Sequence, residues 1–166
     1  QYILILSLCL VNNALALIEI DITEGNREPL PIAISDFFYD EIDSSKLSEI
    51  SVNLSNVVKA DLERCWLFET INKDAFIQNN SAMHLRPRFE DWRLIKSQAL
   101  VTGKLKIVDG DKLRVEFRLW DTLAEKEIEA LVLITTLDNW RRISHMISDK
   151  VYERLTGERG YFDTRI

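Results

Sequence analysis

The stretch Val101-Thr-Gly-Lys-Leu-Lys-Ile-Val-Asp-Gly-Asp-Lys-Leu-Arg-Val-Glu-Phe-Arg-Leu119 decides the fold of this chain. Apolar and polar residues alternate on both sides of Asp109-Gly110, a dipeptide typical of two-residue hairpin turns. A period of two places the apolar side chains on one face of a sheet and the polar ones on the other. The stretch therefore predicts a β-hairpin with one buried face, and residues 128–135 predict a third strand beside it.

Two amphipathic helices are predicted on either side of this hairpin in the sequence. In each, apolar residues recur at steps of three and four, the spacing of one helix face. The first helix follows the capping residues Asp43-Ser44-Ser45, and the second is predicted to start at Asp138 as N-cap and to stop at Gly157. The apolar positions are Leu47, Ile50, Leu54, Val57, Val58 and Leu62 in the first helix, and Trp140, Ile143, Ile147, Val151 and Leu155 in the second.

The N-terminal part adds further strands to the predicted sheet. Residues 17–23 alternate between apolar and polar side chains, and residues 66–71 suit a short strand. Residues 30–34 are entered through two prolines, so this strand should lie at an edge or begin at Ile32. Weak helical pieces are expected at residues 73–78 and 90–96. The order predicts an α/β fold: a mixed sheet of about five or six strands with two main helices packed on one face.

Composition restricts the function. The 166 residues suit one domain, and the net charge of −6 argues against nucleic-acid binding, which needs clustered Lys and Arg. Five glycines and the absence of GxGxxG or a P-loop make a phosphate-binding loop improbable. We expect no cofactor, no metal and no small-molecule substrate.

The first residues resemble an export signal. The apolar run at 2–11 has the length of a signal-peptide h-region, and Ala14-Leu15-Ala16 forms an A-x-A cleavage site. We therefore expect residues 1–16 to be a signal peptide whose basic n-region is missing, cleaved near Ala16. Lipidation at Cys9 is disfavoured, because Leu8 before it is not small and Cys9 lies inside the apolar run.

Candidate catalytic groups are few. His145 has Asp149 four residues on, and this pair is interpreted as packing and not as an acid–base site. Cys65 is interpreted as a small buried thiol. The acidic stretch Asp36–Asp43 brackets three aromatic residues and leaves open a hydrolase with paired carboxylates. No catalytic constellation is recognised, so we predict that the protein is not an enzyme.

The end of the chain, Trp140 to Ile166, resembles the end of the N-terminal domain of the TolB family, where W-R-x-x-x-H-x-x-S-D-x-V-Y/F-E-x-L-T-G leads into G-x-F-x-T-R-I. The start at Ile18–Gly25 is similar to the opening of mature TolB, and Val101-Thr102-Gly103 and Leu119-Trp120-Asp121 agree in pattern. Asp163 and the acidic Asp36–Asp43 stretch depart from what the family leads us to expect.

The resemblance implies a periplasmic interaction module of the Tol–Pal cell-envelope system, linked to envelope integrity, cell division and bacteriocin import. It implies a TolA-binding segment at residues 17–27, an α/β domain at 28–166, and binding of Pal by a β-propeller that would follow Ile166. We expect a monomer. The implied TolA-binding residues are Ile18, Glu19, Ile20, Asp21, Ile22 and Thr23, and the implied propeller-facing residues are Tyr161, Phe162, Thr164 and Arg165.

Two alternatives remain open. One is a stand-alone exported domain that binds a ligand or a protein, and the other is a periplasmic hydrolase that uses carboxylates near Phe37–Tyr39. A pocket with two converging carboxylates would favour the hydrolase.

Overall fold

The computed structural model describes residues 18–20, 28–40, 45–79 and 85–164. The predicted signal peptide lies outside the described residues, as do Asp21, Ile22, Thr23, Arg165 and the capping pair Asp43-Ser44.

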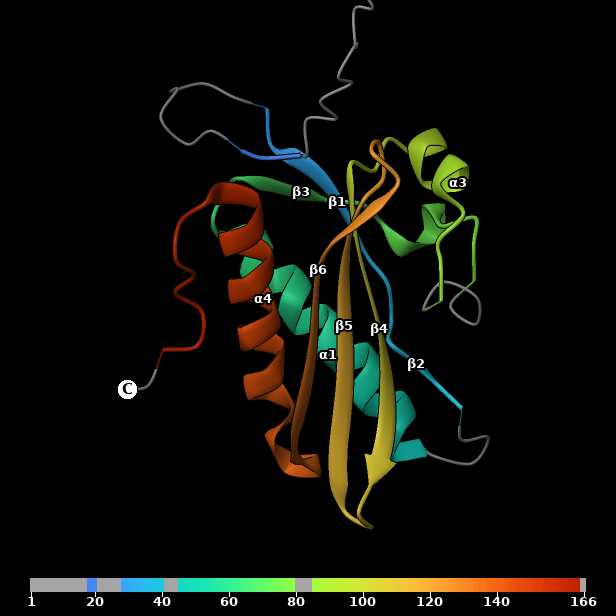
Figure 1. The fold of residues 1–166 in the computed structure, drawn as a ribbon, viewed down its shortest axis with the longest axis vertical. Coiled ribbons are helices and arrows are strands. Elements are labelled where there is room, and N and C mark those ends of the chain that lie inside the picture. Colours follow the sequence, from blue (N-terminus) through green and yellow to red (C-terminus); the bar gives the residue numbers. More distant parts are fainter. Residues whose placement is uncertain (1–17, 21–27, 41–44, 80–84, 165–166) are drawn as a thin grey trace, which may run out of the picture.

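The described chain forms one mixed six-stranded sheet in the order β3-β1-β4-β5-β6, with β2 paired to β4 beyond the end of β1 (Figure 1). β1, β2 and β3 run parallel to their neighbours, whereas β4, β5 and β6 form an antiparallel meander. The predicted fold class is confirmed. The strands are β1 Leu30–Ile34, β2 Phe38–Tyr39, β3 Phe68–Thr70, β4 Ala99–Val108, β5 Lys112–Asp121 and β6 Lys126–Thr136.

The turn between β4 and β5 has the predicted chemistry. Asp109 and Gly110 adopt φ values of 51° and 83°, the left-handed conformations that a tight hairpin turn requires. Val108 pairs with Lys112 across this turn, and the register continues without a break to Ala99 and Asp121. The hairpin prediction is therefore confirmed in position, although the loop between the paired residues has three residues, Asp109 to Asp111, instead of two.

β1 lies inside the sheet, between β3 and β4, so the expectation of an edge strand is wrong. The strand also begins at Leu30 and not at Ile32. Pro31 is tolerated there because its carbonyl accepts from the Gln98 N–H, one residue before β4 begins. A backbone N–H at this position would point to the same side as the carbonyl, toward β4. The pairing of β1 with β4 starts only at Ile32, so the missing N–H removes no hydrogen bond from this ladder.

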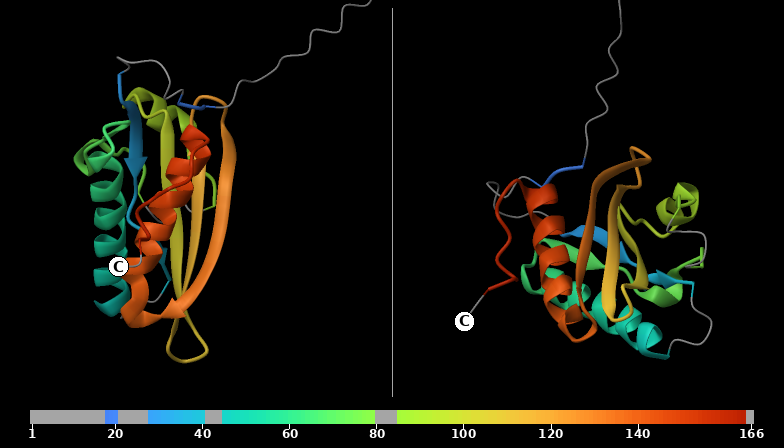
Figure 2. Two further views of the ribbon diagram at one scale, coloured as in Figure 1. Left: turned by 90° about the vertical axis from the view of Figure 1, so that its left-hand side faces the viewer. Right: turned by 60° about the horizontal axis from the view of Figure 1, so that its bottom comes forward.

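Helices α1 (Ser45–Arg64) and α4 (Trp140–Thr156) pack against each other on one face of the sheet (Figure 2). Their buried side chains join those of the sheet in the main core. The short helix α3 (Phe89–Leu94) lies on the opposite face, where Phe89 and Trp92 form a second, smaller core with Ala33, Leu100 and Trp120. Because β1 and β4 contribute to both cores, the sheet is covered on both faces at this end.

Two helix-end predictions differ in outcome. Gly157 ends α4 at φ 73°, and its N–H donates to the Glu153 carbonyl, as predicted for a left-handed C-terminal glycine. Asp138 is not the N-cap: a 3₁₀ turn over Leu137–Asn139 precedes α4, and the cap residue is Asn139. The β6 strand runs to Thr136, one residue beyond the predicted strand, so the chain needs this tight turn to enter the helix.

Candidate partner-binding site

The N-terminal segment predicted to bind a partner starts where β5 and α4 end. The Ile18 N–H donates to Asp121 Oδ2 at 2.9 Å, and the Ile20 N–H donates to the Leu155 carbonyl at 2.5 Å. Both isoleucines are half-buried against the main core, and Glu19 between them is exposed. Within the described residues 18–20 the segment pairs with no strand, which differs from the strand predicted by its alternation.

The turn that follows Asp121 orients its carboxylate for the contact with Ile18. Asp121 is the last residue of β5 and only 1% exposed. Its Oδ1 accepts from the N–H groups of Leu123 and Ala124, at 2.9 and 2.8 Å, an arrangement common for Asp at the start of a turn. Oδ2 is left as the acceptor for Ile18. Sequence reasoning missed this role, although an Asp directly after a predicted strand is a turn signal.

The second acceptor comes from the end of α4. The last four carbonyls of a helix lack partners within the helix. Here Gly157 satisfies the Glu153 carbonyl and Ile20 satisfies that of Leu155. The N-terminal segment thus supplies a donor to one of the carbonyls at the end of α4, at the buried residue Leu155.

An open hollow lies beside the segment. Its lining includes Glu19, Glu28 and Glu69, and none of its described lining residues is a Lys or Arg. The other lining residues are Ile20, Pro29, Leu30, Pro31 and Gln98. The described lining of this hollow is therefore acidic and apolar in character.

The C-terminal tail lies along α4. Asp149 accepts from the N–H groups of Phe162 and Asp163, at 2.7 and 3.1 Å. The Tyr161 and Phe162 rings lie 5.4 and 6.1 Å from that of Tyr152, and burial raises the pKa of both Tyr152 and Tyr161. Tyr161 is nevertheless 53% exposed.

Two further contacts fix the position of this tail. A Cβ at Gly160 would lie 2.4 Å from Asp149 Oδ1, so only glycine allows the approach. Asp163, the residue that departs from the family pattern, forms an ion pair with Arg142 at 3.2 Å. Thr164 is exposed at the end of the described tail.

The sequence left open whether His145 pairs with Asp149, and the structure gives His145 a different partner, Asp61. His145 Nδ1 lies 2.7 Å from Asp61 Oδ2 on α1, and the Ser148 hydroxyl donates to the same oxygen at 2.9 Å. Asp149 instead holds the tail, because the turn after Gly157 brings residues 162–163 back beside it. Both α4 side chains converge on one carboxylate, so the Ser148 hydroxyl donates to Asp61 and not to a histidine base that could activate it as a nucleophile. The cluster joins α1 to α4.

The remaining candidates have structural partners. Cys65 is half-buried, its thiol donates to the Leu62 carbonyl, and burial raises the pKa of the thiol, which disfavours a nucleophilic role. Asp36 is bound by Lys73 and by the Ser55 hydroxyl, and Asp40 pairs with Lys104 at 2.6 Å. These carboxylates therefore face lysines and not each other.

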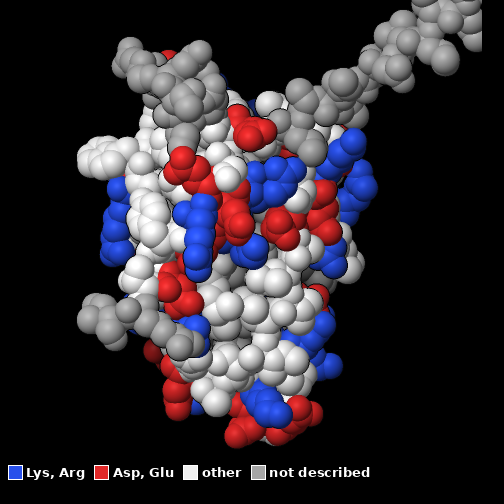
Figure 3. Space-filling view, turned by 60° about the vertical axis from the view of Figure 1, so that its left-hand side comes forward, with Lys and Arg blue, Asp and Glu red and all other residues white. Residues whose placement is uncertain are grey.

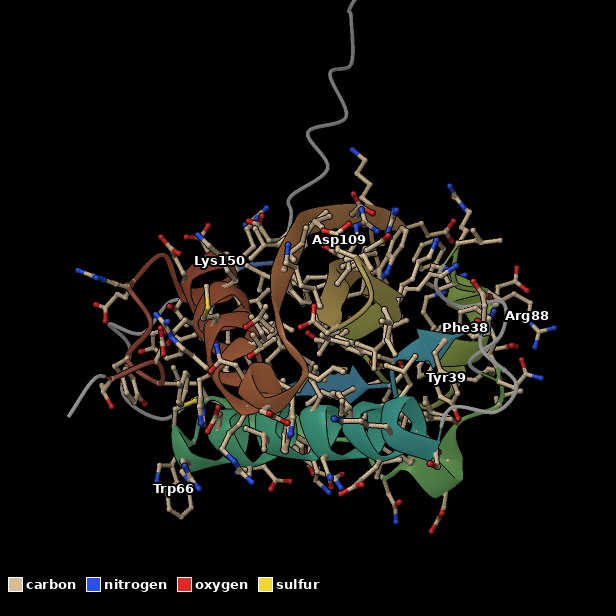
Figure 4. The ribbon with its side chains drawn as sticks, turned by 90° about the horizontal axis from the view of Figure 1, so that it is seen from below. Phe38, Tyr39, Trp66, Arg88, Asp109 and Lys150 are labelled. Atoms are coloured by element: carbon tan, nitrogen blue, oxygen red, sulfur yellow. The ribbon has the colours of Figure 1, made fainter. Side chains whose placement is uncertain are left out.

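The aromatic residues next to these carboxylates and the aromatic residue next to Cys65 lie at two separate places. Phe37 is buried, and Phe38 and Tyr39 form β2 at the margin of the sheet (Figure 4). Trp66 projects from the end of α1, is 86% exposed and has a left-handed φ of 61°.

Comparison with known proteins identifies the family. The family model of the TolB amino-terminal domain matches residues 18–128. The chain belongs to the TolB family. Its structure resembles the crystal structure of TolB from Acinetobacter baumannii with a TM-score of 0.65 and 26% identity, over 82% of this chain and 31% of that one.

The TolB relationship extends over the full sequence. The Tol-Pal system protein TolB of Pelagibacter ubique (strain HTCC1062) is 52% identical over 172 residues, which cover 100% of this chain and 38% of that protein. This chain therefore spans less than half the length of the TolB proteins it matches. None of the helices among the described residues is both long and apolar enough to cross a membrane.

Proposed function

We propose that this chain acts, without catalysis, as the N-terminal interaction domain of a Tol–Pal system protein, and that it binds TolA through residues 18–23. The proposal places the protein in the periplasm, exported by the leader at 1–16, in the service of envelope integrity and cell division. Pal binding and bacteriocin import would depend on residues beyond Ile166.

The observation that carries the proposal is the way residues 18–20 are attached. They are held by one carboxylate oxygen and one helix-end carbonyl, and two half-buried isoleucines pack beneath them. Releasing residues 18–20 breaks no β-ladder among the residues that the structure describes. A short alternating segment can then add to the edge of a partner's sheet through its main chain.

The docked and released states of the N-terminal segment differ little in the hydrogen bonds that the rest of the domain keeps. Asp121 keeps its two turn hydrogen bonds when the segment leaves, and Oδ2 can be solvated. Within the described residues 18–20, binding of TolA would therefore compete with two hydrogen bonds from main-chain N–H groups and with the burial of Ile18 and Ile20. This supports an N-terminus that exchanges between docked and released positions.

The hydrolase alternative is less well supported. It needs two carboxylates that converge on a substrate, whereas Asp36 and Asp40 are each paired with a lysine. The stand-alone binding domain is also disfavoured, since the family match extends to proteins more than twice as long.

The proposal is tested by calorimetric titration of the C-terminal domain of TolA from the same organism into residues 17–166. A second protein starts at Asn26, and a third carries Ile20→Asp. We expect binding by the first, and at least a tenfold weaker affinity for the other two, because the apolar strand face is deleted or charged.

A matched control is Val52→Asp, which places the same charge at an exposed apolar residue of α1. It should bind like the unsubstituted chain, and circular dichroism should show all four proteins folded. Equal binding by the protein that starts at Asn26 would move the site into the folded domain. Absence of binding by every protein would refute the TolA proposal.

A further inference from the structure

The edges of the sheet are unequally protected. An unpaired edge strand offers free N–H and C=O groups to any other strand, and proteins usually shorten, charge, bulge or cover such edges. β3 and β2 have only three and two residues. β6, at the other end of the sheet, has 11 residues and pairs only with β5 among the described strands.

The first part of β6 carries several protective features. Lys126, Glu127 and Glu129 are charged, and the register with β5 shifts between Leu119 and Trp120, opposite these residues. The Arg154 side chain from α4 also donates to the Ile128 carbonyl at 2.9 Å. These features hinder the approach of another strand at this end.

From Ala130 to Thr136 these protective features are missing. This stretch contains no charged residue, no proline and no register shift. Its outward side chains share a face with Arg118, Glu116 and Arg114 of β5, yet they are themselves uncharged. Val132 and Ile134 on that face are 50% and 59% exposed. Figure 3 shows this side of the molecule with a charged band across its upper part, a largely uncharged area below the band and further charged side chains at the bottom.

We propose that residues 130–136 of β6 pair antiparallel with the same residues of a second copy of this chain, which joins two sheets across a two-fold axis at Leu133. The stretch is self-complementary about that residue. Val132 would lie opposite Ile134 of the second copy, and Ala130 opposite Thr136. Apolar residues thus meet apolar or small ones, and no charge faces a like charge within the paired stretch.

The length of the stretch sets the expected strength. Seven residues of edge pairing bury far less surface than the roughly 1,200–2,000 Å² of a stable interface, so the dimer should be weak and dependent on concentration. The sequence alone led us to expect a monomer. Residues 130–136 of β6 lead us to expect a dimer in concentrated protein instead. This proposal does not depend on TolA binding.

Sedimentation equilibrium of residues 17–166, from about 10 µM to about 1 mM, tests the proposal. We expect a reversible monomer–dimer equilibrium, and at least a tenfold larger dissociation constant for Val132→Lys/Ile134→Lys, because two pairs of ammonium groups meet at the axis. Val52→Lys, an equivalent change on α1, should dimerise like the unsubstituted chain.

A charge-swap pair distinguishes pairing from misfolding. Val132→Glu/Ile134→Glu should also be monomeric, whereas an equal mixture of the Lys and Glu variants should restore a heterodimer. A chain that stays monomeric at about 1 mM overturns the proposal. So does a dimer that neither double variant weakens, since another surface would then hold it.

Discussion

At the scale of single residues, three carboxylates, of which Asp61 and Asp121 are buried and Asp149 is half-buried, each hold two parts of the chain together. Asp121 joins the β5–β6 turn to the N-terminal segment, Asp149 joins α4 to the C-terminal tail, and Asp61 joins α1 to His145. Each carboxylate accepts hydrogen bonds from groups distant in the sequence or in the next turn. A buried acceptor is stable only when such donors are present.

Replacing Asp121 by Asn should release the N-terminal segment. Asn can keep the acceptor for Leu123 and Ala124, but it places an NH₂ group where Oδ2 accepts from Ile18. Hydrogen bonds to a charged group contribute roughly 1.5–3 kcal/mol, so the docked population should fall at least about tenfold. Hydrogen exchange of the Ile18–Ile20 amides, followed by mass spectrometry, measures this.

The control is Asp111→Asn, which removes the same charge from the exposed hairpin turn. Its amide exchange at residues 18–20 should match that of the unsubstituted chain. If Asp121→Asn leaves that exchange unchanged, Asp121 does not hold the segment.

At the scale of elements, the regular patterns predicted most of the fold. The Asp109-Gly110 turn and the alternation around it give β4 and β5 to within a residue or two, and the helical periodicities give α1 and α4. What failed depends on contacts between distant residues. The central position of β1 follows from pairing with β3 and β4, and the partner of His145 follows from how α1 crosses α4.

Gly103 shows how an element can depend on one residue. A Cβ there would lie 2.6 Å from the Phe37 ring and 2.5 Å from the Glu116 carbonyl oxygen of β5. Gly103→Ala should therefore destabilise the domain by about 1–3 kcal/mol, the usual range for overpacking, measured by urea unfolding. Phe37→Leu in the same chain should recover part of the loss. Additive effects of the two substitutions would contradict a clash between these side chains.

At the scale of the whole molecule, two cores share one sheet. β1 places Ile32 and Ile34 in the main core and Ala33 in the smaller one, and β4 does the same with Val101 and Leu100. Neither core can lose its packing without disturbing strands that the other needs. The helices differ, since α1 and α4 contact only the main core and α3 only the smaller one.

Because β1 and β4 belong to both cores, we predict that the domain unfolds in a single cooperative transition. Trp92 is 1% exposed, stacks edge-on with Phe76 and donates to Gln78, so Trp92→Ala should cost about 3–5 kcal/mol. Although the substitution touches only the smaller core, far-UV and near-UV circular dichroism should still give coincident urea transitions, both shifted to lower urea. If the near-UV signal were lost before the far-UV signal, the smaller core would be an independently unfolding unit, and α3 a separable part of the domain.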